Sequence, residues 1–306
     1  MNPFFTLMRR EWMQHRSGWL LLMCAPTVLL LLLSFADGGL QISVNDSDVK
    51  LPPLNQAPAL LQTALLMAVV AGITFAVALL AMVFQLPGLA RRDQQDRSVE
   101  FWTSLPIGHA SGVAALLLTQ ILVLPWLALV VGLAGGLLVT AVTVSATYGP
   151  LAWLLQPWGL LLGAAAALLL RLSVGLLLAA AWLSPLLLLP MAASAWLKRW
   201  GVPAVVLTGL VGTVLVDRKL PEPLVGPALQ RLSSEAVQAL LQLEPLQPKV
   251  ALRGVDMPDF LAQLPAQLLH DTAALLGHAA TAAFALALAG GALGFVLLVL
   301  RRQRGG

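Results

Sequence analysis

Long apolar stretches alternate with short polar segments along the chain, and this pattern predicts helices that cross a membrane. A helix needs about 20 apolar residues to cross roughly 30 Å of hydrocarbon. Six stretches meet or approach this length, and we expect each to form a span: about 18–36, 60–89, 113–142, 172–197, 202–216 and 273–300. The sequence therefore predicts an all-α, polytopic membrane protein in which six transmembrane helices form a single domain.

Residues 143–171 are the least regular part of this pattern. Pro150 and Pro157 interrupt helix formation, whereas the tryptophans beside them are typical of a membrane interface. We therefore expect an external loop here, with an interfacial or re-entrant helix that leads into the fourth span. Further external loops are predicted at 37–59 and 217–272.

The positive charges indicate how the spans are oriented. If both termini are cytoplasmic, eleven of the 18 lysines and arginines lie inside and six lie outside, with Arg171 in neither group. Such an excess marks cytoplasmic segments. A seventh span would move one of the arginine-rich termini outside, so the six-span arrangement is preferred.

The N-terminal segment combines an amphipathic helix with the first span. Residues 1–17 are predicted to form a helix that lies along the inner membrane surface. Ser34-Phe35-Ala36 resembles a signal-peptidase site, but the apolar run before it exceeds the usual ~7–15 residues of a signal peptide. We expect an uncleaved first helix.

Composition excludes several classes of function. Hydrophobic residues make up 59% of the chain and charged residues 10%, against about 25% charged residues in soluble domains. The net charge of +4 does not indicate nucleic-acid binding, because the basic residues lie at the ends of apolar runs. Neither the single cysteine nor the four histidines have metal-ligand spacing. We expect no catalytic residue, metal site or cofactor in this chain.

A dense group of charged and aromatic residues interrupts the pattern in the predicted cytoplasmic loop 91–112. The group's charged members lie within ten residues: Arg91, Arg92, Asp93, Asp96, Arg97 and Glu100. Phe101, Trp102, Leu105 and Pro106 follow them. Apolar side chains beside charges in water are typical of a protein-binding surface. We expect this segment to dock a soluble partner; the alternative is a solvated turn whose arginines only fix topology.

The sequence of this loop resembles that of a known family. The run 96–107, DRSVEFWTSLPI, is similar to the signature loop that follows the second span in type-two ABC exporter permeases. Ala195-Trp196-Leu197-Lys198-Arg199 resembles the short cytoplasmic turn after their fourth span, and the arginines at 301–302 resemble the end of their last helix. Glu100 departs from the pattern, because an apolar residue is frequent there.

The resemblance implies a dimer of six-span subunits in a bacterial inner membrane, formed with a second copy or a sister subunit. Each subunit would dock a soluble P-loop ATPase through this loop, the coupling helix, and ATP and Mg²⁺ would bind to the ATPase. The chain itself has no G-x-x-x-x-G-K-(S/T) motif. The expected function is therefore that of a non-catalytic permease subunit in an ATP-driven exporter, and its apolar walls would suit a lipid-like, peptide or other hydrophobic cargo.

Arg171 is the other charged residue of interest. An arginine at mid-bilayer costs at least ~2.5–3.5 kcal/mol, but at the outer end of the fourth span its side chain can reach the surface. The functional alternative is a contact to an anionic substrate or lipid headgroup. No predicted span contains Asp or Glu, which disfavours an ion-coupled secondary transporter. A membrane-bound enzyme and a non-transporting assembly or sensor subunit are further alternatives.

Two G-x-x-x-G motifs occur within predicted spans. They begin at Gly132 and Gly290. Glycines at this spacing let helices approach closely, so each motif predicts either packing within the chain or a contact between subunits.

Overall fold

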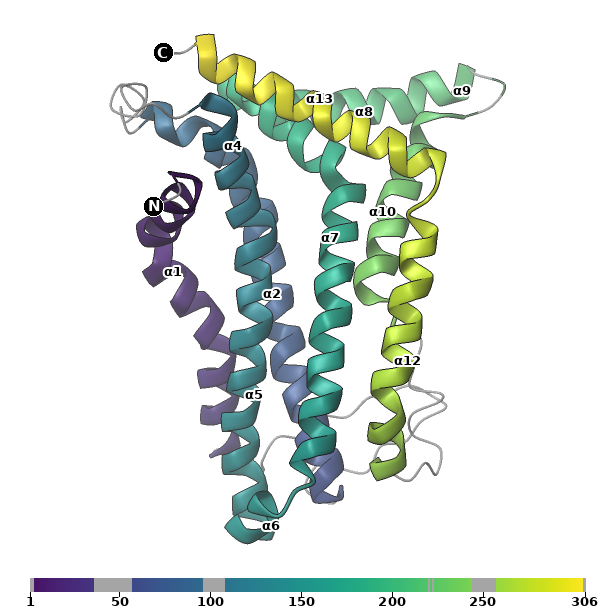
Figure 1. Cartoon of the computed structure of the whole chain (residues 1–306). Helices are drawn as coiled ribbons and strands as arrows, with labels where there is room; N and C mark the ends of the chain where they lie inside the picture. Colours follow the sequence, from purple (N-terminus) through teal and green to yellow (C-terminus); the bar gives the residue numbers. More distant parts are fainter. Residues whose placement is uncertain are drawn as a thin grey trace.

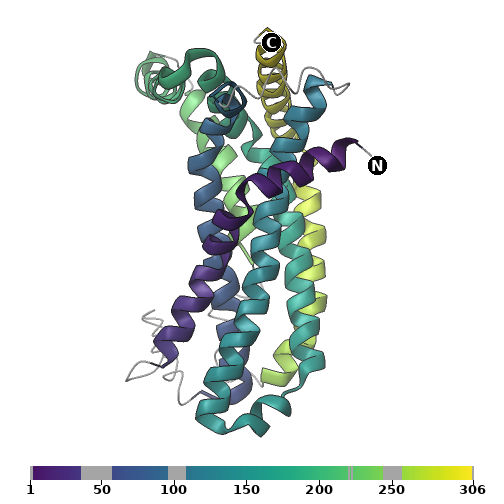
Figure 2. The same ribbon diagram turned by 90° about the vertical axis from the view of Figure 1, so that its left-hand side faces the viewer.

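The chain forms a bundle of long helices (Figures 1 and 2). The computed structural model describes residues 3–35, 57–95, 108–219, 221, 223–243 and 257–304. Within these ranges the chain is helical and contains no strand, which confirms the all-α prediction. The helices along the length of the bundle are α1 (Pro3–Ser34), α2 (Ala59–Gln95), α5 (Leu124–Tyr148), α7 (Trp158–Leu197) and α12 (Met257–His278).

Shorter elements connect and cover these helices. α4 (His109–Leu118) continues through the π-helical turn η2 (Thr119–Val123) into α5. The others are α6 (Pro150–Leu154), η3 (Lys198–Trp200), α8 (Gly201–Val211), η4 (Gly212–Val216), α9 (Asp217–Lys219), α10 (Val225–Leu241) and α13 (Ala282–Arg304).

Five helical segments are long and apolar enough to cross a membrane, and they indicate a multi-pass membrane protein. They are Phe4–Ser34, Ala59–Leu89, His109–Tyr148, Trp158–Lys219 and Ala282–Arg304. The sequence predicts six, with separate spans at 172–197 and 202–216. The structure differs because one of the five segments contains both stretches.

That segment reverses direction at η3. Lys198 has φ 55°, a conformation that non-glycine residues rarely adopt. Gly201 follows, and a Cβ there would lie only 2.3 Å from the Cα of Ser194. α8 therefore folds back on the end of α7 and lies across the end of the bundle (Figure 1). Fifteen residues are too short for a span of about 20 residues, and here they pack across the end of the bundle instead.

Two stretches that were predicted to be external loops contain bundle helices. The first half of α7 includes residues 158–171, because Pro157 occupies the N-cap position, where proline does not interrupt a helix. Within 217–272, α10 and α12 both pack along α7. The amphipathic stripe of α12 is buried through Leu261, Leu264 and Leu268. The predicted interruptions at Pro150 and Pro157 are present, since α5 ends at Tyr148 and α6 at Leu154, but most of the described residues in both stretches are helical. The predicted loop 37–59 lies mostly outside the described ranges.

The last predicted span, 273–300, contains a break between two helices. α12 ends at His278, and α13 begins at Ala282, where the hydroxyl of Thr281 accepts a hydrogen bond from the backbone N–H of Phe284 (3.3 Å). α13 then runs across the end of the bundle (Figure 1). Both helices follow α7 in parallel register, with the neighbouring pairs Arg171–Asp271, Trp182–Phe284, Leu188–Gly294 and Ala195–Arg301.

One end of the bundle collects the arginine-rich segments. The two chain termini, the C-terminal end of α2, the start of α4 and α8 all lie at this end in Figure 1. α6 and the start of α12 lie at the opposite end. Figure 2 shows that the N-terminal part of α1 leans away from the remainder of this helix.

Both G-x-x-x-G motifs pack within the chain. A Cβ on Gly132 would lie 2.7 Å from the Cα of Ala71, and one on Gly136 would lie 2.8 Å from the Cα of Met67. α5 therefore touches the backbone of α2 directly. Gly290 and Gly294 pack in the same way against α7. These contacts favour packing within the subunit, the first of the two alternatives.

The close contact between α5 and α2 can be tested by adding side-chain volume. Gly136→Val places new atoms against the α2 backbone, and such overpacking typically costs about 1–3 kcal/mol. We expect a lower midpoint of thermal unfolding in detergent. Gly72→Val on α2 is the matched control, because its Cβ meets nothing within 4 Å. Equal midpoints for the two variants would contradict this packing.

Candidate functional site

The predicted docking loop lies mostly outside the described residues. Arg91, Arg92 and Asp93 belong to the last turns of α2, but the placement of their side chains is not described. The other predicted docking residues fall outside the described ranges altogether: Asp96, Arg97, Glu100, Phe101, Trp102, Leu105 and Pro106. Their role stays a prediction, and the structure bears on it only through the helices that flank the loop.

Those flanking helices share one apolar cluster with the ends of α7 and α13, which we call the end cluster. Its buried members are Met82, Leu86 and Leu89 of α2, Val113, Leu116 and Leu117 of α4, Leu188, Met191, Ala192 and Ala195 of α7, and Leu298 of α13. Close-packed interiors transmit displacement because they contain few voids. Movement of α2 or α4, the helices at the two ends of the loop, would therefore displace α7 and α13.

Arginines of α13 strengthen this end of the bundle. The Nε of Arg301 donates a hydrogen bond to the carbonyl oxygen of Ala195 (3.2 Å). The guanidinium carbons of Arg301 and Arg304 lie 5.8 and 5.5 Å from the ring centre of Trp196, within the range of cation–π attraction. At the start of α4, a Cβ on Gly112 would lie 2.7 Å from Nη1 of Arg302.

The second candidate site is a buried ion pair between Arg171 of α7 and Asp271 of α12. The Arg171 side chain is 0% exposed and that of Asp271 is 12% exposed. The guanidinium Nε donates a hydrogen bond to Oδ2 of Asp271. The expectation that this side chain reaches the surface is therefore wrong, because the guanidinium is enclosed among the helices and meets neither lipid nor water.

Arg171 also caps the C-terminal end of α10. Its Nη1 donates to the carbonyl oxygen of Ala239 (2.7 Å), and its Nη2 donates to that of Gln242 (3.1 Å). The last carbonyls of a helix have no partner inside the helix and carry partial negative charge. The guanidinium thus neutralises a carboxylate and satisfies a helix end at the same point.

Gly175 makes room for this arrangement one turn after Arg171. A Cβ at position 175 would lie 2.3 Å from the carbonyl oxygen of Ala239 and 2.8 Å from Nη1 of Arg171. No side chain fits there without moving α10. Glycine is therefore required for α10 to reach the guanidinium.

Apolar packing encloses the ion pair from both directions along α7. Toward the start of α7, Leu161 and Ala164 pack with Leu261, Leu264 and Leu268 of α12. Toward its end, a second cluster joins α7, α10 and α13 through Ala179, Trp182, Ala236, Ala239 and Ala287. This enclosure limits access of water, so the pair interacts in an environment of low dielectric constant.

Sequence reasoning missed Asp271, although a signal was present. Leu261, Leu264 and Leu268 form an apolar stripe, and three further residues lead to Asp271 on the same helical face. A carboxylate that continues a buried stripe needs a cationic partner. The stripe could therefore have identified Asp271 as the partner of Arg171. Arg171 is the one basic residue that the charge count assigned to neither side of the membrane.

The ion pair offers little catalytic chemistry. Three of the five guanidinium N–H groups are already used. The side chain of His278, near the end of α12, lies outside the described part of the structure. Where the structure describes the chain, no three His, Cys, Asp or Glu side chains gather as metal ligands. The geometry favours a structural role for the pair.

Comparisons with protein-family models, with curated proteins and with solved structures found no significant match.

Removal of the carboxylate tests how much the bundle depends on the pair. Asp271→Asn leaves a buried guanidinium without its counter-charge, and loss of one partner of a buried pair typically costs about 3–5 kcal/mol. We expect a large fall in the midpoint of thermal unfolding. The matched control is Asp259→Asn, the same substitution at an exposed position of the same helix. A midpoint as high as that of the control would argue against the buried pair.

Proposed function

We propose that this chain is the membrane-spanning permease subunit of an ATP-driven ABC exporter. Its support is the loop sequence of residues 96–107 together with a multi-pass helical bundle. A separate soluble P-loop ATPase would bind and hydrolyse ATP with Mg²⁺. A second copy of the chain or a sister subunit would complete the membrane part. The membrane would be a bacterial inner membrane.

The observation that carries the proposal is the end cluster. α2 and α4, which flank the signature loop, pack in that cluster against α7 and α13. A partner that pushes the loop therefore acts on four helices at once. This is the packing that a lever needs, since rigid elements transmit rigid-body motion. A loop whose only role was to fix topology would not require its two flanking helices to pack against α7 and α13.

We infer only the chemical class of the cargo, from the polarity of the helices. The buried side chains of the helices are mostly apolar, and the guanidinium of Arg171 already donates three of its five N–H groups to partners within the chain. A path between such helices suits a hydrophobic, lipid-like or peptide cargo. Movement would follow from ATP-driven closure of the ATPase pair and the resulting displacement of the loop.

Asp271 supports a second candidate, an ion-coupled secondary transporter. Such carriers usually need a carboxylate within the membrane, and α12 brings one into the bundle. Arg171 already neutralises this carboxylate, which weakens its use as a proton or ion site. Transport by the purified chain on an ion gradient alone would favour this candidate over an exporter, and transport activity at all would separate both from an assembly or sensor subunit.

Docking can be tested with the apolar residues of the loop. The triple substitution Phe101→Ala, Trp102→Ala and Leu105→Ala removes three anchors, and interface hot spots are each worth about 2 kcal/mol or more. We expect co-purification with the proposed partner, a soluble P-loop ATPase, to fall by at least tenfold.

A matched control alters three exposed leucines at the opposite end of the bundle, Leu151, Leu154 and Leu155, to alanine. This control should retain the ATPase. Unchanged co-purification of the loop variant, or equal loss in both, would remove the docking proposal.

The orientation of the loop gives a separate test. In a background with Cys24→Ala, Ser104→Cys lies in the loop and Thr147→Cys lies at the opposite end of the bundle. A membrane-impermeant maleimide should label Thr147→Cys in intact cells and Ser104→Cys only after permeabilisation. The reverse pattern would contradict a cytoplasmic docking loop.

A further inference from the structure

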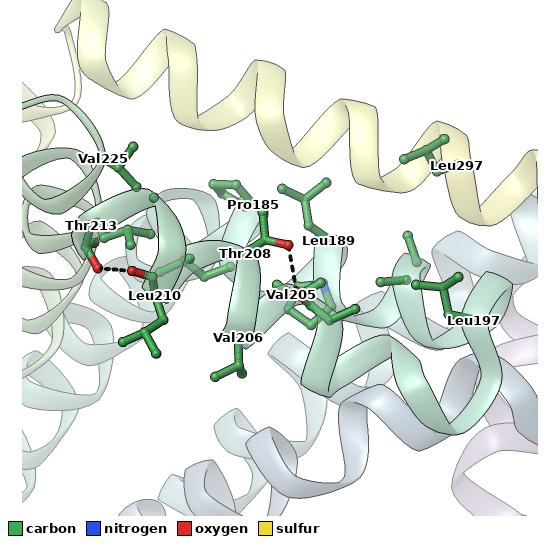
Figure 3. Close-up of a pocket in the computed structure, with 18 of the residues that line it drawn as sticks. Pro185, Leu189, Leu197, Val205, Val206, Thr208, Leu210, Thr213, Val225 and Leu297 are labelled. Atoms are coloured by element: carbon green, nitrogen blue, oxygen red, sulfur yellow. Dashed lines mark hydrogen bonds between the residues drawn. The ribbon is translucent and has the colours of Figure 1, made fainter. Parts of the chain in front are cut away.

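An apolar groove lies between the second half of α7, α8 with η4, and the first half of α10, and α13 contributes Leu297 (Figure 3). Its volume is about 1220 Å³, above the ~300–1,000 Å³ of most small-molecule sites. Its walls are formed almost entirely by aliphatic side chains and proline, and the polar side chains among them are Thr208, Thr213 and Trp196.

None of these three polar groups has a free donor, because each already donates to a backbone carbonyl oxygen. Thr208 donates to the carbonyl oxygen of Ala204 (2.7 Å) and Thr213 to that of Leu210 (3.0 Å), as the dashed lines in Figure 3 show. The indole N–H of Trp196 donates to the carbonyl oxygen of Leu297 (3.3 Å). The groove therefore offers an occupant no free side-chain donor, and its apolar walls suit a hydrocarbon chain.

The length of the groove suits one lipid chain. Its α7 wall runs from Pro185 to Leu197, which at the rise of an α-helix corresponds to about 18 Å. Half of a hydrocarbon core of ~30 Å is about 15 Å, the depth that one acyl chain occupies. The wall and the chain match to within a few ångströms.

One end of the groove is positively charged. Leu197 lines the groove, and Lys198 and Arg199 follow it directly, both exposed and without an ion pair to any residue that the structure describes. Arg301 and Arg304 face Trp196, which lines the same end. A negatively charged group at this end would complement four cations, whereas a second copy docked face to face would bring like charges together.

We propose that the groove binds an acyl chain of an anionic glycerophospholipid, with the lipid phosphate against Lys198 and Arg199. The apolar walls exclude water from the chain, and the basic residues select the net negative headgroup. This lipid site does not depend on the proposed exporter function, because it rests on the groove and its charged end alone.

Native mass spectrometry of the full chain in detergent tests the proposal, with phosphatidylglycerol and phosphatidylcholine of identical chains as the probes. Basic residues near a lipid surface contribute about 1 kcal/mol each, or roughly fivefold in affinity. We expect phosphatidylglycerol to bind at least fivefold more tightly. Lys198→Gln with Arg199→Gln should remove that preference and keep the weaker binding of phosphatidylcholine, whereas Lys198→Arg with Arg199→Lys should retain the preference.

A second variant fills the groove. Gly209 lines it, and a Cβ there meets nothing within 4 Å, so Gly209→Trp adds volume without a clash at its first atom. Binding of both lipids should fall about fivefold or more. Gly163→Trp is the matched control, because position 163 is equally open and lies outside the groove.

Several results would overturn the proposal. One is equal affinity of the unmodified chain for both lipids; another is a preference that survives the double glutamine variant. A third is a chain dimer that Gly209→Trp dissociates while lipid binding stays unchanged, since the groove would then hold a second copy. Lys198 and Arg199 are exposed, so the variant Lys198→Gln with Arg199→Gln still tests the proposal if Gly209→Trp does not fold.

Discussion

A guanidinium buried among apolar helices is the constraint on which the arrangement of this bundle depends. An unpaired charge there would cost several kcal/mol, so the chain must bring a carboxylate and hydrogen-bond acceptors to Arg171. α12 supplies Asp271, and α10 ends where its last carbonyls can accept from the two Nη atoms. Glycine is required at position 175 of α7, because any side chain there would collide with the Ala239 carbonyl of α10. One side chain thus fixes the relative positions of three helices.

The apolar helices could be predicted from the sequence because hydrophobic length is a local property. The partner of Arg171 could not, since Asp271 lies 100 positions later and the contact depends on the register of α12 against α7. Pro157 marks a helix boundary, as predicted, but the helix that begins after it, Trp158–Leu197, runs without a break into the predicted fourth span. The break between His278 and Ala282 lies in an apolar run without proline, and so the prediction of a continuous span was wrong there.

For the docking loop, the sequence is more informative than the structure. Its residues attract attention through sequence alone, as a charged and aromatic segment between apolar stretches. Their placement lies outside the described residues, and what the structure adds is the end cluster at their two roots. The sequence therefore predicts which residues form the docking surface, whereas the packing indicates which helices a force on that surface would move.

Two interruptions divide the bundle along its length. Pro185 and Pro190 fall within α7, where each removes a backbone donor and favours a bend. The α12–α13 break precedes them in the parallel register, before the Trp182–Phe284 pair, whereas Pro185 packs against Gly290 of α13, so the two interruptions bound one level of the bundle. On one side of this level the end cluster joins the loop roots to α7 and α13, and on the other the Arg171 pair joins α7, α10 and α12. In the proposed permease, a displacement of the loop would therefore act first on the second half of α7 and on α13, which the end cluster joins to the helices that flank the loop.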